Sequence, residues 1–140
     1  MKAVNVNYLS ILIVSLINML IGYVWYSQKF FGKKWEELSG LNRKGENLFA
    51  RAKIKQIPIY FLLSFFTAHI FFIFSDYFGT TTIGEGAQLG LWIWFGFVLT
   101  NSIYEFIFPK KTKSWELFFI NNFYILTNLI VMGMILAIWR

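Results

Sequence analysis

The 140-residue sequence contains no cysteine, a single histidine and only two prolines. The lack of cysteine excludes disulfides, thiol nucleophiles and metal sites built on thiolates. One histidine, His69, is too few for a histidine-rich metal site, so no metal and no cofactor are expected. Charge is scarce as well, because only 14% of the residues are charged, against about 25% in an average soluble domain.

Apolar residues are abundant instead, at 57% of the chain with a mean hydropathy of +0.56. Four apolar runs approach the length of about 20 residues that a helix needs to cross a bilayer. They cover residues 6–27, 57–75, 87–108 and 115–139. A helix satisfies its own backbone groups within one span, so lipid favours helices here. The sequence therefore predicts an all-α polytopic membrane protein, with residues 1–140 forming one domain of four transmembrane helices in a compact bundle.

The start of the second span depends on Pro58. Proline is tolerated in the first turn of a helix, where its missing N–H has no partner to lose. If the helix begins near residue 57, Pro58 therefore lies in its first turn. If it begins further back, near Glu46, Pro58 marks a kink. The sequence leaves both alternatives open.

The basic residues are distributed unevenly between the predicted loops. Eight lysines and arginines lie between the first two spans, three lie between the third and fourth, and only Lys2 and Arg140 lie elsewhere. The positive-inside rule then places both basic loops in the cytoplasm and both termini outside. This topology accounts for the net charge of +6, so no nucleic-acid partner is expected.

Aromatic and basic residues gather where the predicted spans meet these loops. Tryptophan and tyrosine prefer the membrane interface, while lysine extends toward phosphate headgroups. The predicted interface aromatics are Trp25, Tyr26, Trp35 and Trp115. The predicted headgroup contacts are Lys29, Lys33, Lys34, Lys110 and Lys111, and the expected partners are therefore membrane lipids, above all anionic ones.

The two basic loops also resemble each other. Residues 31–38 read FGKKWEEL and residues 108–117 read FPKKTKSWEL. Duplication of a two-helix unit would give two related halves, whereas convergence would give the same residues, since any such interface favours aromatics and lysines. Both interpretations remain open.

Polar residues inside the predicted spans are the candidate site, because lipid penalises them. The predicted intramembrane polar site consists of Asn18, Asn101, Glu105, Asn121 and Asn128, with Glu105 at its cytoplasmic mouth. Asn101 lies eight residues before Pro109 and Asn121 lies seven after Ser114, so regular helices would bring both amides to the same depth, facing each other. Regular helical geometry also puts Gly86, Gly90, Trp94, Phe97, Asn101 and Glu105 on one face. Alternatively, the amides only join helices, and Gly86-x-x-x-Gly90 only lets two helices approach closely.

Several short motifs, in this order and spacing, resemble a bacterial membrane family catalogued as domain of unknown function 1761. They are Asn7-Tyr8-Leu9, Gly22, Trp25-Tyr26-Ser27, Phe31-Gly32-Lys33, Trp35, Leu89-Gly90, Gly96-Phe97-Val98, the stretch Trp115 to Asn121, Tyr124 and Val131-Met132-Gly133. The resemblance implies a four-helix integral protein of the bacterial cytoplasmic (inner) membrane. It implies no activity.

Three functions fit these observations to different degrees. The preferred hypothesis is a small homo-oligomeric transport or permeation module, because four short spans enclose little volume alone. The alternative is a structural or accessory membrane subunit that binds a partner protein or anionic lipid through its basic segment 28–55, without transport or catalysis. An enzyme acting on lipid is the weakest hypothesis, because the chain lacks cysteine, a second histidine and a pair of intramembrane carboxylates.

Overall fold

A computed structural model describes residues 5–40, 56–108 and 114–139. Within these ranges every regular element is helical, which confirms the predicted all-α class for the described part of the chain. Lys110, Lys111 and most of the basic segment 28–55 lie outside the described residues. The elements in chain order are α1 (Tyr8–Trp25), α2 (Gly32–Leu38), α4 (Ile57–Tyr77), α5 (Ile83–Ile93), η1 (Trp94–Leu99), α6 (Thr100–Ile107) and α7 (Trp115–Ile138).

Three of these helices, α1, α4 and α7, are long and apolar enough to cross a membrane. Their ends fall within two residues of the predicted spans 6–27, 57–75 and 115–139. The fourth predicted span, 87–108, corresponds to α5, η1 and α6, which follow one another without a break from Ile83 to Ile107. By length and composition these three helices indicate a multi-pass membrane protein.

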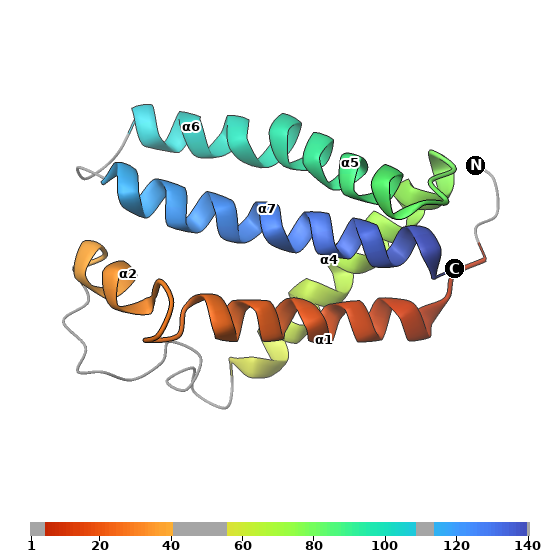
Figure 1. The fold of residues 1–140 in the computed structure, drawn as a ribbon, viewed down its shortest axis with the longest axis horizontal. Coiled ribbons are helices and arrows are strands. Elements are labelled where there is room, and N and C mark those ends of the chain that lie inside the picture. Colours follow the sequence, from red (N-terminus) through yellow and green to blue (C-terminus); the bar gives the residue numbers. More distant parts are fainter. Residues whose placement is uncertain (1–4, 41–55, 109–113, 140) are drawn as a thin grey trace.

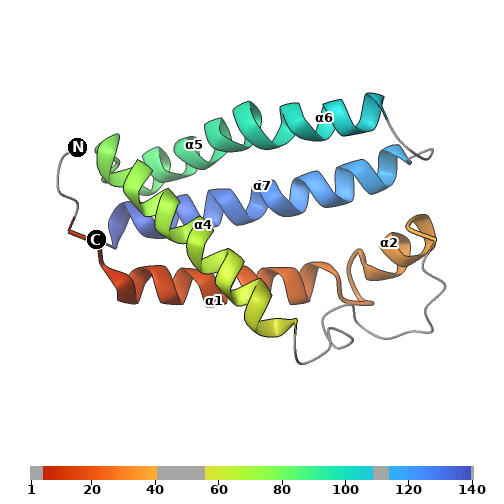
Figure 2. The ribbon, with the colours of Figure 1, turned by 180° about the vertical axis from the view of Figure 1, so that it is seen from behind.

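The helices form a bundle in which α1, α7 and the α5–α6 run lie side by side, while α4 crosses them obliquely (Figures 1 and 2). The buried core lies where α1, α4 and α7 meet, and it consists of Ile11, Val14, Ala68, Phe71, Phe72, Leu129, Met132 and Leu136. Helix α2 lies at one end of the bundle, beside the start of α7. The start of α1 and the end of α7 lie at the opposite end (Figure 1).

Local sequence explains where two of the long helices begin. The Asn7 side-chain oxygen accepts the backbone N–H groups of Leu9 and Ser10 at 3.1 and 3.2 Å, which caps α1. Helix α4 begins at Ile57, with Pro58 in its first turn. Of the two alternatives for Pro58, the start of α4 at Ile57 supports the first, while residues 46–55, where the other helix would begin, lie outside the described ranges.

Helix α5 begins earlier than the predicted residue 87. The Thr82 hydroxyl accepts the N–H of Glu85, and the Glu85 carboxylate accepts the N–H of Thr82, so the two residues form a capping box. The box fixes the helix start at Ile83. Hydropathy alone missed this turn because Gly84 and Glu85 are not apolar.

Glycines bring α5 and α7 into backbone contact. A Cβ atom on Gly86 would overlap the carbonyl oxygen of Gly133, and a Cβ atom on Gly133 would overlap that of Gly86. A Cβ atom on Gly90 would lie 2.5 Å from the carbonyl oxygen of Leu129. The close approach expected from Gly86-x-x-x-Gly90 is therefore confirmed, and α7 is the partner helix.

The segment η1, Trp94–Leu99, is a π-helix of six residues. A π turn is wider than an α turn, so it changes the direction in which all later side chains point. The sequence analysis assumed a regular α-helix through this region. The single face expected for residues 86 to 105 is wrong for that reason: Gly86 and Gly90 are buried against α7, whereas Asn101 and Glu105 are exposed.

Candidate functional site

Asn18 and Asn128 line one cavity of about 230 Å³ between α1, α4 and α7. Asn18 comes from the middle of α1 and Asn128 from the middle of α7, so the cavity lies halfway along the bundle. The other lining residues are Met19, Tyr60, Leu63, Ser64, Thr67, Tyr124, Ile125, Leu129 and Met132. Two of the five predicted site residues therefore meet here.

A short chain of hydrogen bonds fixes the Asn18 amide. Its Nδ2 donates to the Ser64 hydroxyl at 3.1 Å, and that hydroxyl donates to the backbone carbonyl of Ser15 at 3.2 Å. The Asn18 donor is thus used for contact between α1 and α4. The Oδ1 atoms of Asn18 and Asn128 are both buried without a hydrogen-bond partner. An unsatisfied buried acceptor costs roughly 1–3 kcal/mol, so a bound donor would recover that free energy.

The chemistry of the cavity is neutral. Its polar atoms belong to amides and hydroxyls, and no ionised side chain lines it among the described residues. A water molecule takes about 30 Å³ in the liquid, so the volume admits several waters or one small solute. The arrangement favours small uncharged molecules that donate hydrogen bonds.

Asn121 lies elsewhere, in an aromatic cluster at the end of the bundle that carries α2. Its Oδ1 accepts the Tyr26 hydroxyl at 3.1 Å and the Trp35 ring N–H at 3.0 Å. The Trp25 ring N–H donates to the backbone carbonyl of Ile120 at 3.2 Å. The amide oxygen therefore has two donors and fastens α2 and the end of α1 to α7.

Asn101 and Glu105 form a separate exposed pair on α6. Asn101 Nδ2 lies 3.5 Å from Glu105 Oε1, which is long for a hydrogen bond. No hydrogen bond joins Asn101 to Asn121 in the described part of the chain. The prediction that these two amides face each other is wrong, because the π turn redirects α6 and because Asn121 turns toward α1 and α2.

The predicted interface residues lie at the α2 end of the bundle. Trp115 is exposed, whereas Tyr26 is buried against α7 and contacts the ring of Tyr124 edge-on at 5.1 Å. Lys29 and Lys33 are exposed.

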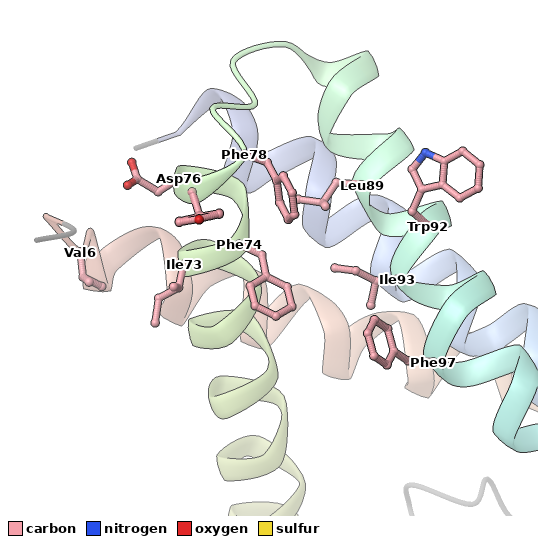
Figure 3. Close-up of a pocket in the computed structure, with 10 residues that line it drawn as sticks. Val6, Ile73, Phe74, Asp76, Phe78, Leu89, Trp92, Ile93 and Phe97 are labelled. Carbon is pink, nitrogen blue, oxygen red and sulfur yellow. The ribbon is translucent and has the colours of Figure 1, made fainter. Parts of the chain in front are cut away.

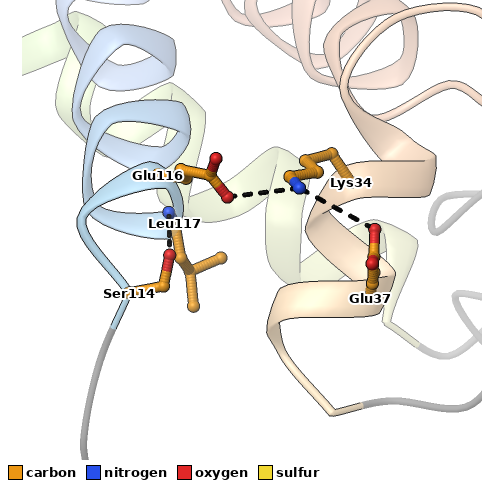
Figure 4. Close-up of polar contacts among 5 residues, drawn as sticks. All are labelled: Lys34, Glu37, Ser114, Glu116 and Leu117. Atoms are coloured by element: carbon orange, nitrogen blue, oxygen red, sulfur yellow. Dashed lines mark hydrogen bonds and ion pairs between the residues drawn. The ribbon is translucent and has the colours of Figure 1, made fainter.

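Lys34, also at this end, joins α2 to α7. Its ammonium lies 3.3 Å from Glu116 and 3.9 Å from Glu37 (Figure 4). Beside this pair, Ser114 caps α7 by accepting the N–H of Leu117 at 3.3 Å.

Sequence reasoning missed the partners that complete the cavity. Ser64, Tyr60 and Thr67 come from α4, and sequence alone did not place them in the site because the apolar residues of that helix do not define a single buried face. Tyr124 was detectable, since it lies one turn before Asn128 on α7 and so shares its face.

Comparison with protein families identifies the chain. A family model described as "Protein of unknown function (DUF1761)" matches residues 9–137. The chain belongs to this family. No curated protein and no solved structure matches the chain. Several residues that carried the resemblance meet in the aromatic cluster described above, namely Trp25, Tyr26, Trp35, Asn121 and Tyr124.

Proposed function

We propose that this protein is a four-span membrane module that lets small uncharged polar solutes permeate, using the cavity at Asn18 and Asn128. The helical run is unbroken through residues 87–107, which supports a fourth span, since about 1.5 Å per residue gives roughly 30 Å, enough to cross the hydrocarbon core. The start of α1 and the end of α7 lie at the same end of the bundle, which an even number of spans requires (Figure 1).

The proposed orientation has the α2 end in the cytoplasm and both termini outside. Lys29, Lys33 and Lys34 all lie at the α2 end, in keeping with the positive-inside rule. Single-cysteine labelling tests it, because the chain has no native cysteine. Gly84→Cys should react with an impermeant maleimide in intact cells, and labelling only after lysis would reverse the orientation.

The observation that carries the proposal is the pair of unpartnered amide oxygens, Asn18 Oδ1 and Asn128 Oδ1, in one cavity at mid-bundle. An acceptor without a hydrogen-bond partner is costly in apolar surroundings. A solute that carries a hydroxyl or amide donor is therefore attracted to the depth at which Asn18 and Asn128 lie. The neutral lining favours uncharged solutes over ions. Helix contact alone does not explain the two oxygens, since neither one bonds a neighbouring helix.

The test is solute entry into liposomes that contain the purified protein. Glycerol and urea are suitable probes, because both are small, neutral and rich in donors. Stopped-flow light scattering should show faster swelling than in protein-free liposomes. Asn18→Leu and Asn128→Leu should return the rate to that of empty liposomes.

Thr127→Val is the matched control. Thr127 precedes Asn128 on α7, but its hydroxyl is satisfied by the Phe123 carbonyl at 2.8 Å and it does not line the cavity. This variant should keep the wild-type rate. The permeation proposal fails if liposomes that contain wild type, like those that contain either leucine variant, swell no faster than empty liposomes with glycerol or with urea.

The exposed pair Asn101 and Glu105 supports assembly of the module as a homo-oligomer. Polar side chains on the outside of a spanning helix are costly in lipid, and a second copy of the chain would cover them. Asn101→Cys should form intermolecular disulfides in membranes under mild oxidation. Leu20→Cys on the exposed face of α1 is the control and should stay monomeric.

The alternative function, an accessory subunit that binds anionic lipid, is favoured by the surface of the α2 end. Lys29 and Lys33 are exposed there beside the exposed ring of Phe30. Each basic residue near an anionic surface contributes about 1 kcal/mol. Native mass spectrometry should then show anionic lipid retained over zwitterionic lipid, with the preference lost in Lys29→Gln/Lys33→Gln. Equal retention of both lipids would count against this alternative.

A further inference from the structure

Three cavities follow one another along α4. The first is the cavity at mid-bundle described above, which we call the amide cavity after its two asparagines. The next, the middle cavity, measures about 350 Å³ and shares Thr67 and Leu129 with the amide cavity. The third, the aromatic groove, measures about 850 Å³ and shares Phe74 and Ile93 with the middle cavity. Because neighbouring cavities share lining residues, each adjoins the next.

The aromatic groove lies where α5 packs against α7 and leaves a space beside the end of α4. Phe74 and Phe78 from α4 face Leu89, Ile93 and Phe97 across it (Figure 3). Phe97 is 71% exposed, so the groove is open at the outer surface of the bundle, which lipid would cover in a membrane. A molecule dissolved in the membrane can therefore enter the series of cavities from the side, without first passing into water.

The middle cavity is apolar and uncharged. Among the described residues its lining has one polar side chain, Thr67, whose hydroxyl already donates to the Leu63 carbonyl at 2.9 Å. The buried ring of Phe71 supplies an aromatic wall. In the described part of the chain, no ionised side chain lines either this cavity or the amide cavity. An ion or a heavily hydrated solute would lose its water here without compensation, so the route favours a neutral molecule with an apolar body.

A hydrogen-bond acceptor lies at the inner end of the route. Asn128 is only 6% exposed, and its Oδ1 has no partner. It precedes Leu129, the α7 residue that lines both the amide cavity and the middle cavity. Asn18 is less accessible from this side, because the described lining of the middle cavity includes no residue of α1. A donor on the ligand would satisfy the Asn128 oxygen.

From this combination we infer that these cavities bind a neutral aromatic molecule of one or two rings with a single hydrogen-bond donor, of the phenol or indole type. Its ring lies in the middle cavity against Phe71 and Phe74, where contacts between aromatic rings add to simple burial. Its donor reaches into the amide cavity and bonds Asn128 Oδ1. An acyl chain would bring no donor to that oxygen. This binding shares the amide cavity with the proposed permeation, and so rests on that site, but it requires no transport.

Fluorine NMR of 5-fluoroindole with the purified full-length protein in nonionic detergent tests this binding on the unaltered chain. The fluorine signal should shift and broaden saturably as protein is added, after correction for micelles without protein, and indole should displace the probe. Indene has the shape of indole but no N–H donor, and 1-methylindole carries a methyl group in place of that hydrogen. Both should compete about tenfold less well than indole, as expected for a lost hydrogen bond in a buried site.

Two variants locate the donor and the ring. Asn128→Leu should remove the preference, so that indole, indene and 1-methylindole compete alike. Ile93→Trp should weaken binding of all three several-fold, because the larger side chain fills the space where the middle cavity and the aromatic groove adjoin.

Leu91→Trp is the matched control. Leu91 also lies on α5, but it is exposed and lines none of the three cavities. This variant should bind 5-fluoroindole like wild type. Circular dichroism would establish that each variant is helical.

Three results would overturn the inference. The first is the absence of saturable binding. The second is competition by indene and 1-methylindole as strong as that by indole, since no acceptor would then select the ligand. The third is wild-type affinity in a folded Ile93→Trp variant. If Ile93→Trp does not fold, the three competitors on wild type decide alone. None of these results depends on whether glycerol or urea permeates, so the two proposals can fail separately.

Discussion

Different kinds of interaction hold the two ends of α7 in place. Its C-terminal half meets α5 through bare backbone, because Gly133 and Gly86 leave no room for a side chain. Its N-terminal part meets α1 and α2 through hydrogen bonds from aromatic donors, with Tyr26 and Trp35 both bonded to Asn121. The first contact is apolar and close, whereas in the second the Asn121 oxygen accepts two hydrogen bonds.

Between these two ends, near the middle of α7, lies an asparagine whose acceptor has no partner. Asn128 is only seven residues from Asn121 on the same helix, yet its Oδ1 has no partner while that of Asn121 has two. The residue type is therefore a poor guide to function. An unmet acceptor is informative where it lines a cavity, as in Asn18 and Asn128, because a bound donor can then satisfy it.

The largest effect is expected from breaking the glycine contact. Gly133→Leu would force α5 and α7 apart, since even a Cβ atom overlaps the Gly86 carbonyl. Overpacking usually costs about 1–3 kcal/mol, and a collision with backbone should reach or exceed the upper end of that range. Thermal unfolding in detergent, followed by circular dichroism, measures the loss.

Gly84→Ala provides the control for this first experiment. A Cβ atom on Gly84 meets nothing within 4 Å, and alanine favours the helix. Its stability should equal or slightly exceed that of wild type. Should Gly133→Leu unfold at the wild-type temperature, the close backbone contact between α5 and α7 would have no energetic role.

The next largest effect separates two asparagines on one helix. Asn121→Leu leaves the Tyr26 hydroxyl and the Trp35 N–H without their acceptor, so it should destabilise the protein by about 1–2 kcal/mol. Asn128→Leu removes an unpartnered oxygen and a single side-chain hydrogen bond to Tyr124, so it should cost less stability than Asn121→Leu. Unfolding midpoints of the two variants, measured side by side, check this difference.

A result in which Asn128→Leu is as destabilising as Asn121→Leu would remove the distinction between the two regions. Trp35→Phe refines the test, because it deletes one of the two donors and keeps an aromatic ring near that of Tyr26. It should cost less than Asn121→Leu. A loss equal to or larger than that of Asn121→Leu would mean that ring packing, rather than the amide, holds this end together.

Much of the bundle was predictable because lipid imposes simple rules. Apolar length placed the ends of α1, α4 and α7 within two residues, and Gly86-x-x-x-Gly90 predicted close helix packing. The capping box of Thr82 and Glu85 was also readable, because it is a local pattern that sets a helix start.

The candidate site was predictable only in part. Asn18 and Asn128 meet, but Asn101 does not join them, because the π turn at Trp94–Leu99 redirects the helix that carries it. That turn has no pattern that we recognise in the local sequence, and in the folded protein it contacts α7. Trp94 shows the packing, since its ring N–H donates to the Asn122 carbonyl at 3.1 Å. Side-chain direction beyond such a turn follows from the tertiary structure alone.

A smaller effect is expected from the ion pair at the polar end of α7. Lys34 and Glu116 are about half exposed, so their contact should contribute at most about 1 kcal/mol and should weaken in salt. Lys34→Met and Glu116→Gln, alone and combined, give the coupling free energy by a double-mutant cycle. Lys33→Met on the exposed side of α2 is the control. A coupling that persists unchanged in 1 M salt would contradict this account.

The smallest effect lies at the glycine-packed end and depends on pH. Backbone N–H groups of Thr81 and Thr82 bond the Glu85 carboxylate and hold its pKa below the ordinary value. A lowered pKa means that the ionised form is bound better in the folded protein, so the stabilisation is complete above the ordinary glutamate pKa. It disappears as pH falls through the lowered pKa of the folded state.

Glu85→Gln cannot titrate but can still cap α5, so subtracting its unfolding midpoints from those of wild type isolates this one group from the other acids. The difference in unfolding midpoint should be constant near neutral pH. Below the ordinary pKa of glutamate, wild type should lose stability relative to Glu85→Gln. A difference that does not change with pH would mean that Glu85 caps α5 no better as a carboxylate than as an amide.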